Sequence, residues 1–220
     1  MTVCWDMEES DVIGETMSEI NIKYSYILQE SGFQYGTEGY YVILSHLSTY
    51  FNNSIIVDMG TYTGGSAQAL AYNKSNTVYT YDVMEDATAI QRFATVECEN
   101  VKYIVGNCIR DSWRGMAVFD DTPPMSDEKI FLSSELIFLD VDPHDGRQEN
   151  DVLNFLISNN WKGIMVCDDI GLGLEIPNSH PPMLEWWNSI DLPKYNISNN
   201  FYASGTGTGI ICFDNQKVIY

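Results

Sequence analysis

The segment Ser54-Ile-Ile-Val-Asp-Met-Gly-Thr-Tyr-Thr-Gly-Gly-Ser66 decides the fold, because it joins a predicted buried strand to a predicted helix through a glycine turn. The β-branched run Ile55 to Val57 is typical of a strand that is covered on both faces. Gly60 closes the strand, and Gly64 to Ser66 open the helix. Glycine lets a backbone approach a ligand, and N–H groups at a helix N-terminus point outward. The turn therefore suits a small-molecule cofactor, and an ordinary strand-to-helix turn is the alternative.

Strands and helices alternate along the rest of the chain. Further strands are predicted at 77–81, 101–105, 135–139 and 163–167, and helices at 40–51, 65–73, 86–98, 147–159 and 183–190. This alternation predicts an α/β fold with a parallel, doubly wound sheet. Residues 194–198 and 209–213 are two more predicted strands, and their link is too short for a helical crossover, so they should pair antiparallel. The polar segment 120–129 predicts a surface loop.

The spacing Asp58-x-Gly60-x-x-x-Gly64 resembles motif I of class I S-adenosylmethionine (SAM) methyltransferases, most closely the catechol O-methyltransferase branch. The G-x-G-x-x-G spacing of dinucleotide enzymes is absent, which disfavours an NAD-dependent oxidoreductase. The resemblance implies a Rossmann-like methyltransferase domain over 33–220. It would have a parallel five-strand core, an antiparallel C-terminal hairpin and helices on both faces. Residues 1–32 would form a helical N-terminal extension.

Candidate cofactor residues follow the strands, because open α/β sheets bind ligands beyond the carboxyl ends of their strands. Asp82 ends the second strand, where a carboxylate can accept both ribose hydroxyls, and a turn or helix-cap role is the alternative. The resemblance implies that Gly106-Asn107-Cys108 contacts adenine and that Asp58 holds the turn or the cofactor's amino group. It also implies that the segment 34–39 closes over the methionine part of SAM. The predicted SAM-binding residues are Tyr35, Gly36, Thr37, Asp58, Gly60, Tyr62, Gly64, Ser66, Asp82, Gly106, Asn107, Cys108 and Asp140.

Two acidic clusters follow neighbouring predicted strands, with Asp140 and Asp142 after one and Asp168 and Asp169 after the next. Close like charges repel by roughly 1–4 kcal/mol per pair, and a divalent cation relieves this repulsion. Ligands that are all oxygen favour Mg²⁺, Mn²⁺ or Ca²⁺ over zinc. The clusters resemble those of catechol and macrocin-type sugar O-methyltransferases, which implies that Asp140 or Asp142, together with Asp168 and Asp169, holds Mg²⁺ or Mn²⁺. Carboxylates that only cap turns are the alternative.

The same resemblance implies metal-assisted O-methyl transfer, in which a base takes the proton of the acceptor hydroxyl. Catechol-type enzymes place a lysine three residues after the first metal-binding aspartate, and Pro143 occupies that position here. His144 is then the first candidate for the base and Asp142 the second. The missing lysine and the Asp140-x-Asp142 pair favour a sugar or glycan hydroxyl as acceptor, with a small catechol or phenol as the alternative.

The segment after Asp169 is predicted to cover the acceptor. His180, Trp186 and Trp187 would form a wall on which a sugar ring stacks, and packing of an indole against the sheet is the alternative. A non-catalytic scaffold domain that keeps the methyltransferase fold is a further functional hypothesis.

The charge balance restricts the partners, since 31 acidic and 11 basic residues give a formal net charge of −20. Such a field disfavours nucleic acid and anionic membranes, and it is compatible with a small-molecule or glycan acceptor. Five cysteines without a C-x-x-C pair favour a reducing compartment over a disulfide framework. No apolar run predicts a membrane span or a signal peptide. A cytoplasmic protein is therefore expected, and a homodimer is possible.

Overall fold

The computed structural model describes residues 40–106, 108, 127–173, 178–197 and 205–214. Several predictions lie outside these residues: the helical extension over 1–32, the domain boundary that follows it, the Tyr35-Gly36-Thr37 segment and Asn107.

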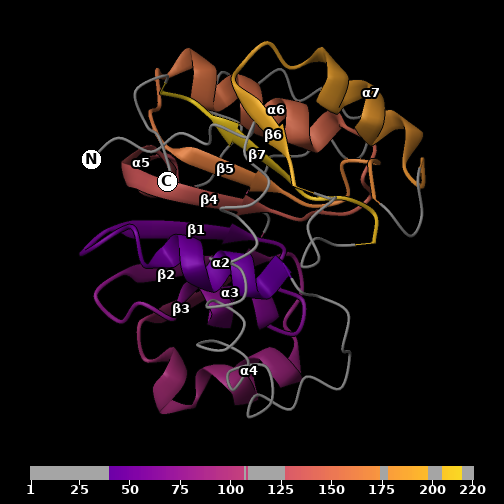
Figure 1. Ribbon diagram of the computed structural model, residues 1–220. Coiled ribbons are helices and arrows are strands. Elements are labelled where there is room, and N and C mark those ends of the chain that lie inside the picture. The colour runs from indigo at the N-terminus through magenta and orange to yellow at the C-terminus, as the bar shows by residue number, and fades with distance from the viewer. Residues whose placement is uncertain (1–39, 107, 109–126, 174–177, 198–204, 215–220) are drawn as a thin grey trace, which may run out of the picture.

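A single seven-stranded sheet runs through the molecule in the order β3-β2-β1-β4-β5-β7-β6 (Figure 1). Strands β1 to β5 pair with one another in parallel, and β7 is antiparallel to both β5 and β6. The predicted parallel core with an antiparallel C-terminal hairpin is therefore confirmed. Strands β2 and β3 follow on one side of β1, whereas β4 and β5 follow on the other side, so the strand order reverses between β1 and β4. Such switch points bind ligands in open α/β sheets. The strands are β1 Ile55–Met59, β2 Thr77–Asp82, β3 Val101–Val105, β4 Ser134–Leu139, β5 Ile164–Cys167, β6 Lys194–Asn196 and β7 Gly209–Cys212.

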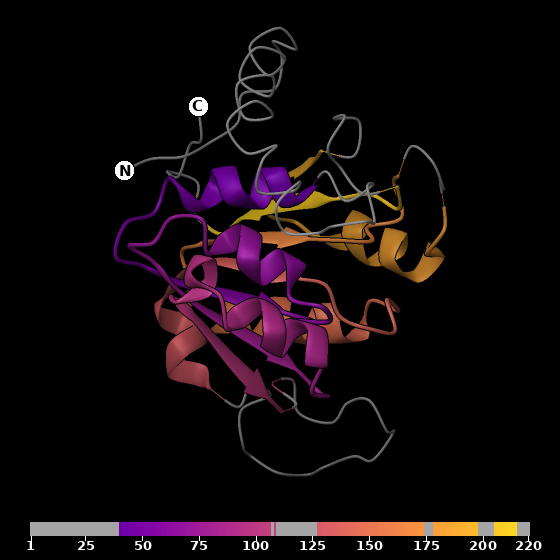
Figure 2. The same ribbon diagram turned by 90° about the horizontal axis from the view of Figure 1, so that it is seen from below.

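Helices cover both faces of the sheet, because its central strands are apolar on both sides. In β4, Leu136 and Phe138 pack in the core cluster that α2 and α3 cover, while Ile137 and Leu139 pack in the cluster that α5, α6 and α7 cover. Helix α4 lies at the β3 end of the sheet and α7 at the opposite end (Figures 1 and 2). The helices are α2 Tyr40–Ser48, α3 Gly65–Leu70, α4 Ala87–Phe93, α5 Glu128–Ser133, α6 Arg147–Ser158 and α7 Pro181–Ser189.

Two local predictions were wrong. The single helix predicted over 86–98 is a short α4 followed by a break and a 3₁₀ turn at Val96–Cys98. The Thr95 hydroxyl donates to the Arg92 carbonyl at the break, a local bond that competes with helix continuation. The loop predicted over 120–129 ends earlier than expected, because α5 already begins at Glu128; residues 120–126 lie outside the described part.

Across the described ranges, none of the helices combines the length and the apolar character that crossing a membrane requires.

Candidate active site

The glycine turn is pressed against the end of β4. Gly60 has φ +95°, and a Cβ atom at this position would lie 1.7 Å from the carbonyl oxygen of Asp140. The Asp140 N–H donates to the Met59 carbonyl at 3.0 Å, which fixes this close approach. Only glycine combines a positive φ with the missing Cβ that the contact requires. The turn of motif I and the first acidic cluster are therefore built against each other.

Asp58 lies beneath the turn and is fully buried. Thr80 of β2 donates a hydrogen bond to its Oδ2 atom, and the Thr80 hydroxyl is itself 2.6 Å from the hydroxyl of Thr61. Burial raises the pKa of Asp58 to about 7, although the hydroxyls of Thr80 and Ser66 oppose the shift. Of the two roles that the sequence leaves open, these contacts fit the one in which Asp58 holds the turn.

Asp82 stands at the end of β2 and organises the neighbouring loop. Its Oδ2 atom accepts the N–H of Tyr62 at 2.7 Å, and its Oδ1 atom accepts the N–H of Met84 at 3.2 Å. A carboxylate offers about four acceptor sites, so both oxygens can still accept a ligand hydroxyl. The Asp82 carbonyl accepts the N–H of Gly106, and a Cβ at Gly106 would meet no atom of the described residues within 4 Å. Ribose binding by Asp82 stays a prediction.

Three other residues of the predicted cofactor set are also placed. Gly64 has φ +84° at the N-cap of α3, and Ser66 is buried in the first turn of that helix. Cys108 is buried in the core cluster under α5, α6 and α7, and its predicted contact with adenine stays a prediction.

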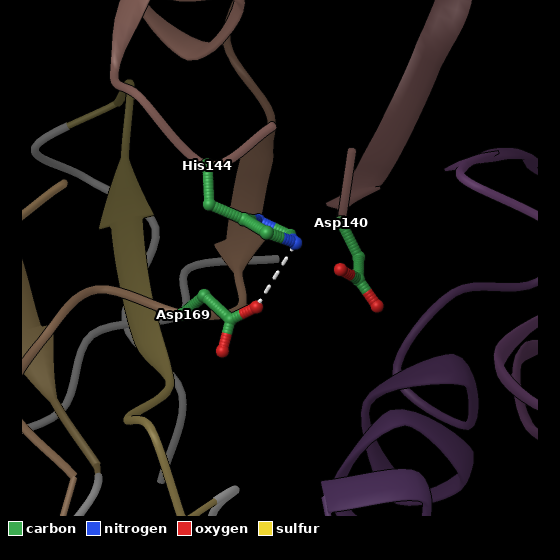
Figure 3. A group of neighbouring side chains, drawn as sticks. All are labelled: Asp140, His144 and Asp169. Carbon is green, nitrogen blue, oxygen red and sulfur yellow. Dashed lines mark ion pairs between the residues drawn. The ribbon is translucent and has the colours of Figure 1, made fainter. Parts of the chain in front are cut away.

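Asp140, His144 and Asp169 meet at the carboxyl ends of β4 and β5 (Figure 3). One ligand-type atom from each of them lies within 4.8 Å of the other two. The imidazole of His144 points toward both carboxylates, and its Nε2 atom is 3.2 Å from Asp169 Oδ2. The side chains of His144 and Asp169 are only 16% and 15% exposed, so water screens this group weakly. We call these three residues the Asp–His–Asp group.

Local backbone features place His144 beside the end of β5. His144 has φ +53° and Asp169 has φ +56°, so both strand ends turn sharply through left-handed residues. The Gln148 side chain donates to the Asp142 carbonyl at 2.9 Å, and Asp145 Oδ1 accepts the N–H of Arg147 where α6 begins. The loop between β4 and α6 is therefore held by α6 itself.

The metal set predicted from the sequence differs from the one that the structure assembles. Asp142 is 93% exposed and stays outside the Asp–His–Asp group, although its Oδ1 atom lies 3.3 Å from His144 Nε2. Asp168 is buried and accepts a hydrogen bond of 3.2 Å from the Thr208 hydroxyl. The side chains of these two consecutive residues after β5 therefore point in different directions. Asp168 faces the segment before β7, while Asp169 faces His144. His144, which was expected to act as the base, instead lies among the side chains that could bind the metal.

The predicted sugar wall is divided by the structure. His180 lies at the start of α7 with its Nε2 atom 3.9 Å from Asp169 Oδ1, and its ring centroid is 5.3 Å from that of His144. Trp186 and Trp187 are instead 6% and 3% exposed and belong to the core cluster. Gly209 of β7 packs so closely on the Trp187 ring that a Cβ would lie 2.4 Å from it. Packing, the alternative reading, describes both indoles.

Sequence reasoning missed Glu149, a carboxylate that lies 2% exposed in the first turn of α6. Burial raises its pKa to about 7, and Asp145 and Asp169 act in the same direction. Within the described part of the chain its two oxygens make no hydrogen bond of normal geometry, although the N–H groups of Gly146 and Glu149 lie close enough to oppose the shift. The sequence does contain a signal for this burial: Glu149 shares the i, i+3, i+4, i+7 face of α6 with Val152, Leu153 and Leu156, which is the face expected to pack against the sheet.

Solved methyltransferase structures share this architecture. A protein described as a caffeoyl-CoA O-methyltransferase from Staphylococcus aureus matches with a TM-score of 0.57 and 13% identity, over 90% of this chain and 98% of that chain. The SAH-bound methyltransferase PaMTH1 of Podospora anserina matches with a TM-score of 0.56 and 12% identity, over 98% and 99% of the two chains. A methyltransferase from Geobacter sulfurreducens gives a TM-score of 0.53 and 15% identity, over 94% and 90%. No family model and no curated protein sequence matches the chain.

The chain has the class I methyltransferase fold. At identities this low the likeness concerns the fold, and function has to be argued from the site. The class I fold explains why the glycine turn after β1 and the acidic ends of β4 and β5 share one edge of the sheet.

Proposed function

We propose that the protein is a SAM-dependent, divalent-metal-assisted O-methyltransferase that acts on a hydroxyl of a sugar or glycan. The observation that carries this proposal is the contact of Gly60 with the Asp140 carbonyl. It joins a motif I turn to the Asp–His–Asp group at the switch point of a methyltransferase fold. Cofactor and acceptor would then meet at one place, which a two-substrate transfer requires.

The cofactor half of the site would use the turn and the ends of β2 and β3. SAM supplies an electrophilic methyl group, which has to be aligned with the acceptor oxygen. Asp58 keeps the turn attached to β2 through Thr80. Asp82 would receive the ribose hydroxyls, and the open space at Gly106 would receive the adenine.

The acceptor half would use the Asp–His–Asp group, whose oxygen and nitrogen donors suit a divalent ion. A bound cation would orient the acceptor hydroxyl and lower its pKa. An Nε2 atom that binds a metal has no lone pair left for a proton, so His144 cannot be ligand and base at once. We assign His144 with Asp140 and Asp169 as ligands, and the exposed Asp142 beside them as the base.

A sugar hydroxyl is proposed as the acceptor because Pro143 replaces the lysine of catechol-type enzymes. His180, the N-cap residue of α7, is 32% exposed beside Asp169 and would contact the acceptor. A net charge of −20 favours a neutral or cationic acceptor and disfavours nucleic acid. A catechol or phenol is the second candidate acceptor, because its adjacent oxygens would suit the same metal.

The first experiment is calorimetric titration of the full chain with SAM and with NAD, in the presence of Mn²⁺, of Mg²⁺, or of EDTA. SAM binding without NAD binding is the expected result, followed by transfer of a labelled methyl group to a panel of sugar and catechol acceptors. Asp169→Asn should bind SAM but lose the transfer, because asparagine keeps the left-handed backbone and removes one anionic ligand. The control Asp191→Asn changes an exposed carboxylate outside the site and should stay active.

The possible outcomes separate the alternatives. A chain that binds no SAM under any of these conditions would overturn the proposal and favour the scaffold hypothesis. Full transfer in EDTA would exclude the metal while leaving the methyltransferase. Transfer to catechols alone would replace the sugar by the second acceptor class.

A further inference from the structure

The Asp–His–Asp group contains a nitrogen donor, and a second imidazole lies beside it. His144 contributes its Nε2 atom between two carboxylates, and the Nε2 atom of His180 lies 3.9 Å from the other oxygen of Asp169. The chain has three histidines, and two of them are here, with ring centroids 5.3 Å apart. The acidic clusters of the sequence predicted oxygen ligands alone, so this donor chemistry differs from the expectation.

The backbone holds both imidazoles in place. Gln148 and Arg147 at the start of α6 anchor the loop that carries His144. His180 is the N-cap residue of α7, and the N–H of Asn178 donates to the Gly171 carbonyl, two residues after Asp169. The residues around the site therefore favour one arrangement before any ligand binds, which lowers the entropy lost on binding.

We infer that this site selects a first-row transition ion, such as Zn²⁺ or Co²⁺, over Mg²⁺ and Ca²⁺. Imidazole is a good ligand for transition ions, whereas Mg²⁺ and Ca²⁺ prefer sites made of oxygen. Affinity should rise from Mn²⁺ through Co²⁺ to Zn²⁺, the general order for first-row ions. The nitrogen donor of His144 should widen the gap between Co²⁺ or Zn²⁺ and Mg²⁺. The inference rests on the metal role that the proposed function gives to the Asp–His–Asp group.

The test is direct metal binding by the full chain after chelation and dialysis, followed by the visible absorption of Co²⁺. One Co²⁺ should bind per chain, Zn²⁺ should displace it, and a large excess of Mg²⁺ should not. His144→Asn should weaken Co²⁺ binding by at least about 10–100-fold, the loss already typical of a second-shell partner. Asparagine suits the left-handed backbone at 144, so the variant should fold. Circular dichroism checks that fold.

Two further variants make the result specific. His144→Asp restores a site of oxygen donors and should narrow the gap between Co²⁺ and Mg²⁺ affinities. His46→Asn is the matched control, because His46 lies on α2 and contacts Tyr50 rather than the site; its Co²⁺ binding should equal that of the native chain. Displacement of Co²⁺ by Mg²⁺ at comparable concentration, or native Co²⁺ affinity in His144→Asn, would overturn the inference.

SAM titrations on the same samples separate the two proposals. SAM binding together with a preference for Mg²⁺ would overturn the metal inference and leave the methyltransferase standing. Selective Co²⁺ binding without any SAM binding would overturn the methyltransferase and leave the metal site.

Discussion

The edge of the sheet at which β1 to β5 end has two halves. One is the glycine turn with its carboxylates, and the other, the acidic half, is made of the aspartates that follow β4 and β5. They differ in which groups balance the negative charge of their carboxylates. Around the glycine turn, Asp58 accepts a hydrogen bond from Thr80, and Asp82 accepts two from backbone N–H groups. At the ends of β4 and β5, by contrast, Asp142 and Asp169 face the imidazole of His144, and Asp169 also lies beside that of His180. Neutral donors of the fold balance the carboxylates of the turn, although Asp58 Oδ1 makes no hydrogen bond of normal geometry to the described residues. The acidic half gathers three carboxylates, those of Asp140, Asp142 and Asp169, around two imidazoles.

This difference indicates where a ligand has most to contribute. A backbone turn that its own hydrogen bonds hold is pre-organised, so a cofactor there gains affinity from geometry. A cluster of carboxylates in a partly buried place is held at a cost in repulsion, and a cation removes that cost. We therefore expect substitutions in the turn to act on stability directly, and those in the acidic half to act through metal binding.

The largest effect is expected for Gly60→Ala. A methyl group there would overlap the Asp140 carbonyl, at a φ of +95° that L-residues rarely adopt. Strain and overpacking together should lower the free energy of unfolding by roughly 3–5 kcal/mol. Urea unfolding measures the loss.

Gly106→Ala is the control for that substitution, because its Cβ would meet no atom of the described part of the chain within 4 Å. It should change the free energy of unfolding by less than about 1 kcal/mol. Equal losses of unfolding free energy in the two variants would mean that the turn is not held by its contact with β4.

Metal addition should give the next effect, at the acidic half alone. A ligand at 100 times its Kd stabilises a protein by about 2.7 kcal/mol, which corresponds to a rise in Tm of roughly 5–10 °C for a chain of this size. Mn²⁺ should produce this rise in the native chain, and Asp169→Asn should abolish it. Thermal unfolding with and without EDTA is the measurement. An unchanged Tm in the native chain would mean that the acidic half is stable without a cation.

The sequence predicted the fold well because its signals are local and periodic. The β-branched run at 55–57, the glycines of the turn and the short link before 209–213 each have one common structural meaning. The prediction of one helix over 86–98 was wrong. The helix breaks where the Thr95 hydroxyl donates a hydrogen bond to the backbone, and hydrophobic periodicity does not report such a bond.

The candidate site was predicted less completely, because a set of ligands depends on the direction in which each side chain points as well as on its position in the sequence. Asp168 and Asp169 are neighbours in sequence, yet one faces Thr208 and the other His144. His144 was expected near the site as a base, and its distances to Asp142 and Asp169 show that its ring lies between carboxylates. The left-handed backbone at 144, which residue type does not predict, is part of that placement. The indoles of α7 were assigned to the acceptor from residue type, while their burial is a tertiary property.

Thr80→Val tests the hydrogen bond that compensates the turn. Valine keeps the shape of threonine and removes the donor to Asp58, which leaves a buried carboxylate with one partner fewer. The loss should be about 1–3 kcal/mol, the usual penalty for a buried group left unsatisfied. It should be larger at pH 8 than at pH 5, because the pKa of Asp58 is about 7 and the charged form needs the donor most. Urea unfolding at both values checks this, and a loss independent of pH would contradict it.

Glu149→Gln tests the acidic half through a group that no metal need contact. Burial raises the pKa of Glu149 from 4.5 to about 7 in the folded chain, so the folded state binds a proton more tightly than the unfolded state. The native chain should therefore lose stability as the pH rises from about 4.5 to about 7, and the loss should persist above that window. Glutamine carries no charge, so the variant should gain about 1–3 kcal/mol relative to the native chain at pH 8 compared with pH 4.

Urea unfolding of both chains at the two pH values measures this gain, and Glu185→Gln, on the exposed side of α7, is the control. The control should differ from the native chain by the same amount at both values. Metal should shrink the gain at Glu149, because a cation near Asp169 lowers the repulsion that helps to raise its pKa. If the gain is equal with Mn²⁺ and with EDTA, Glu149 senses burial alone and the charge of the acidic half does not reach it. A gain that falls on adding Mn²⁺ would instead place the cation beside Asp169, independently of any catalytic assay.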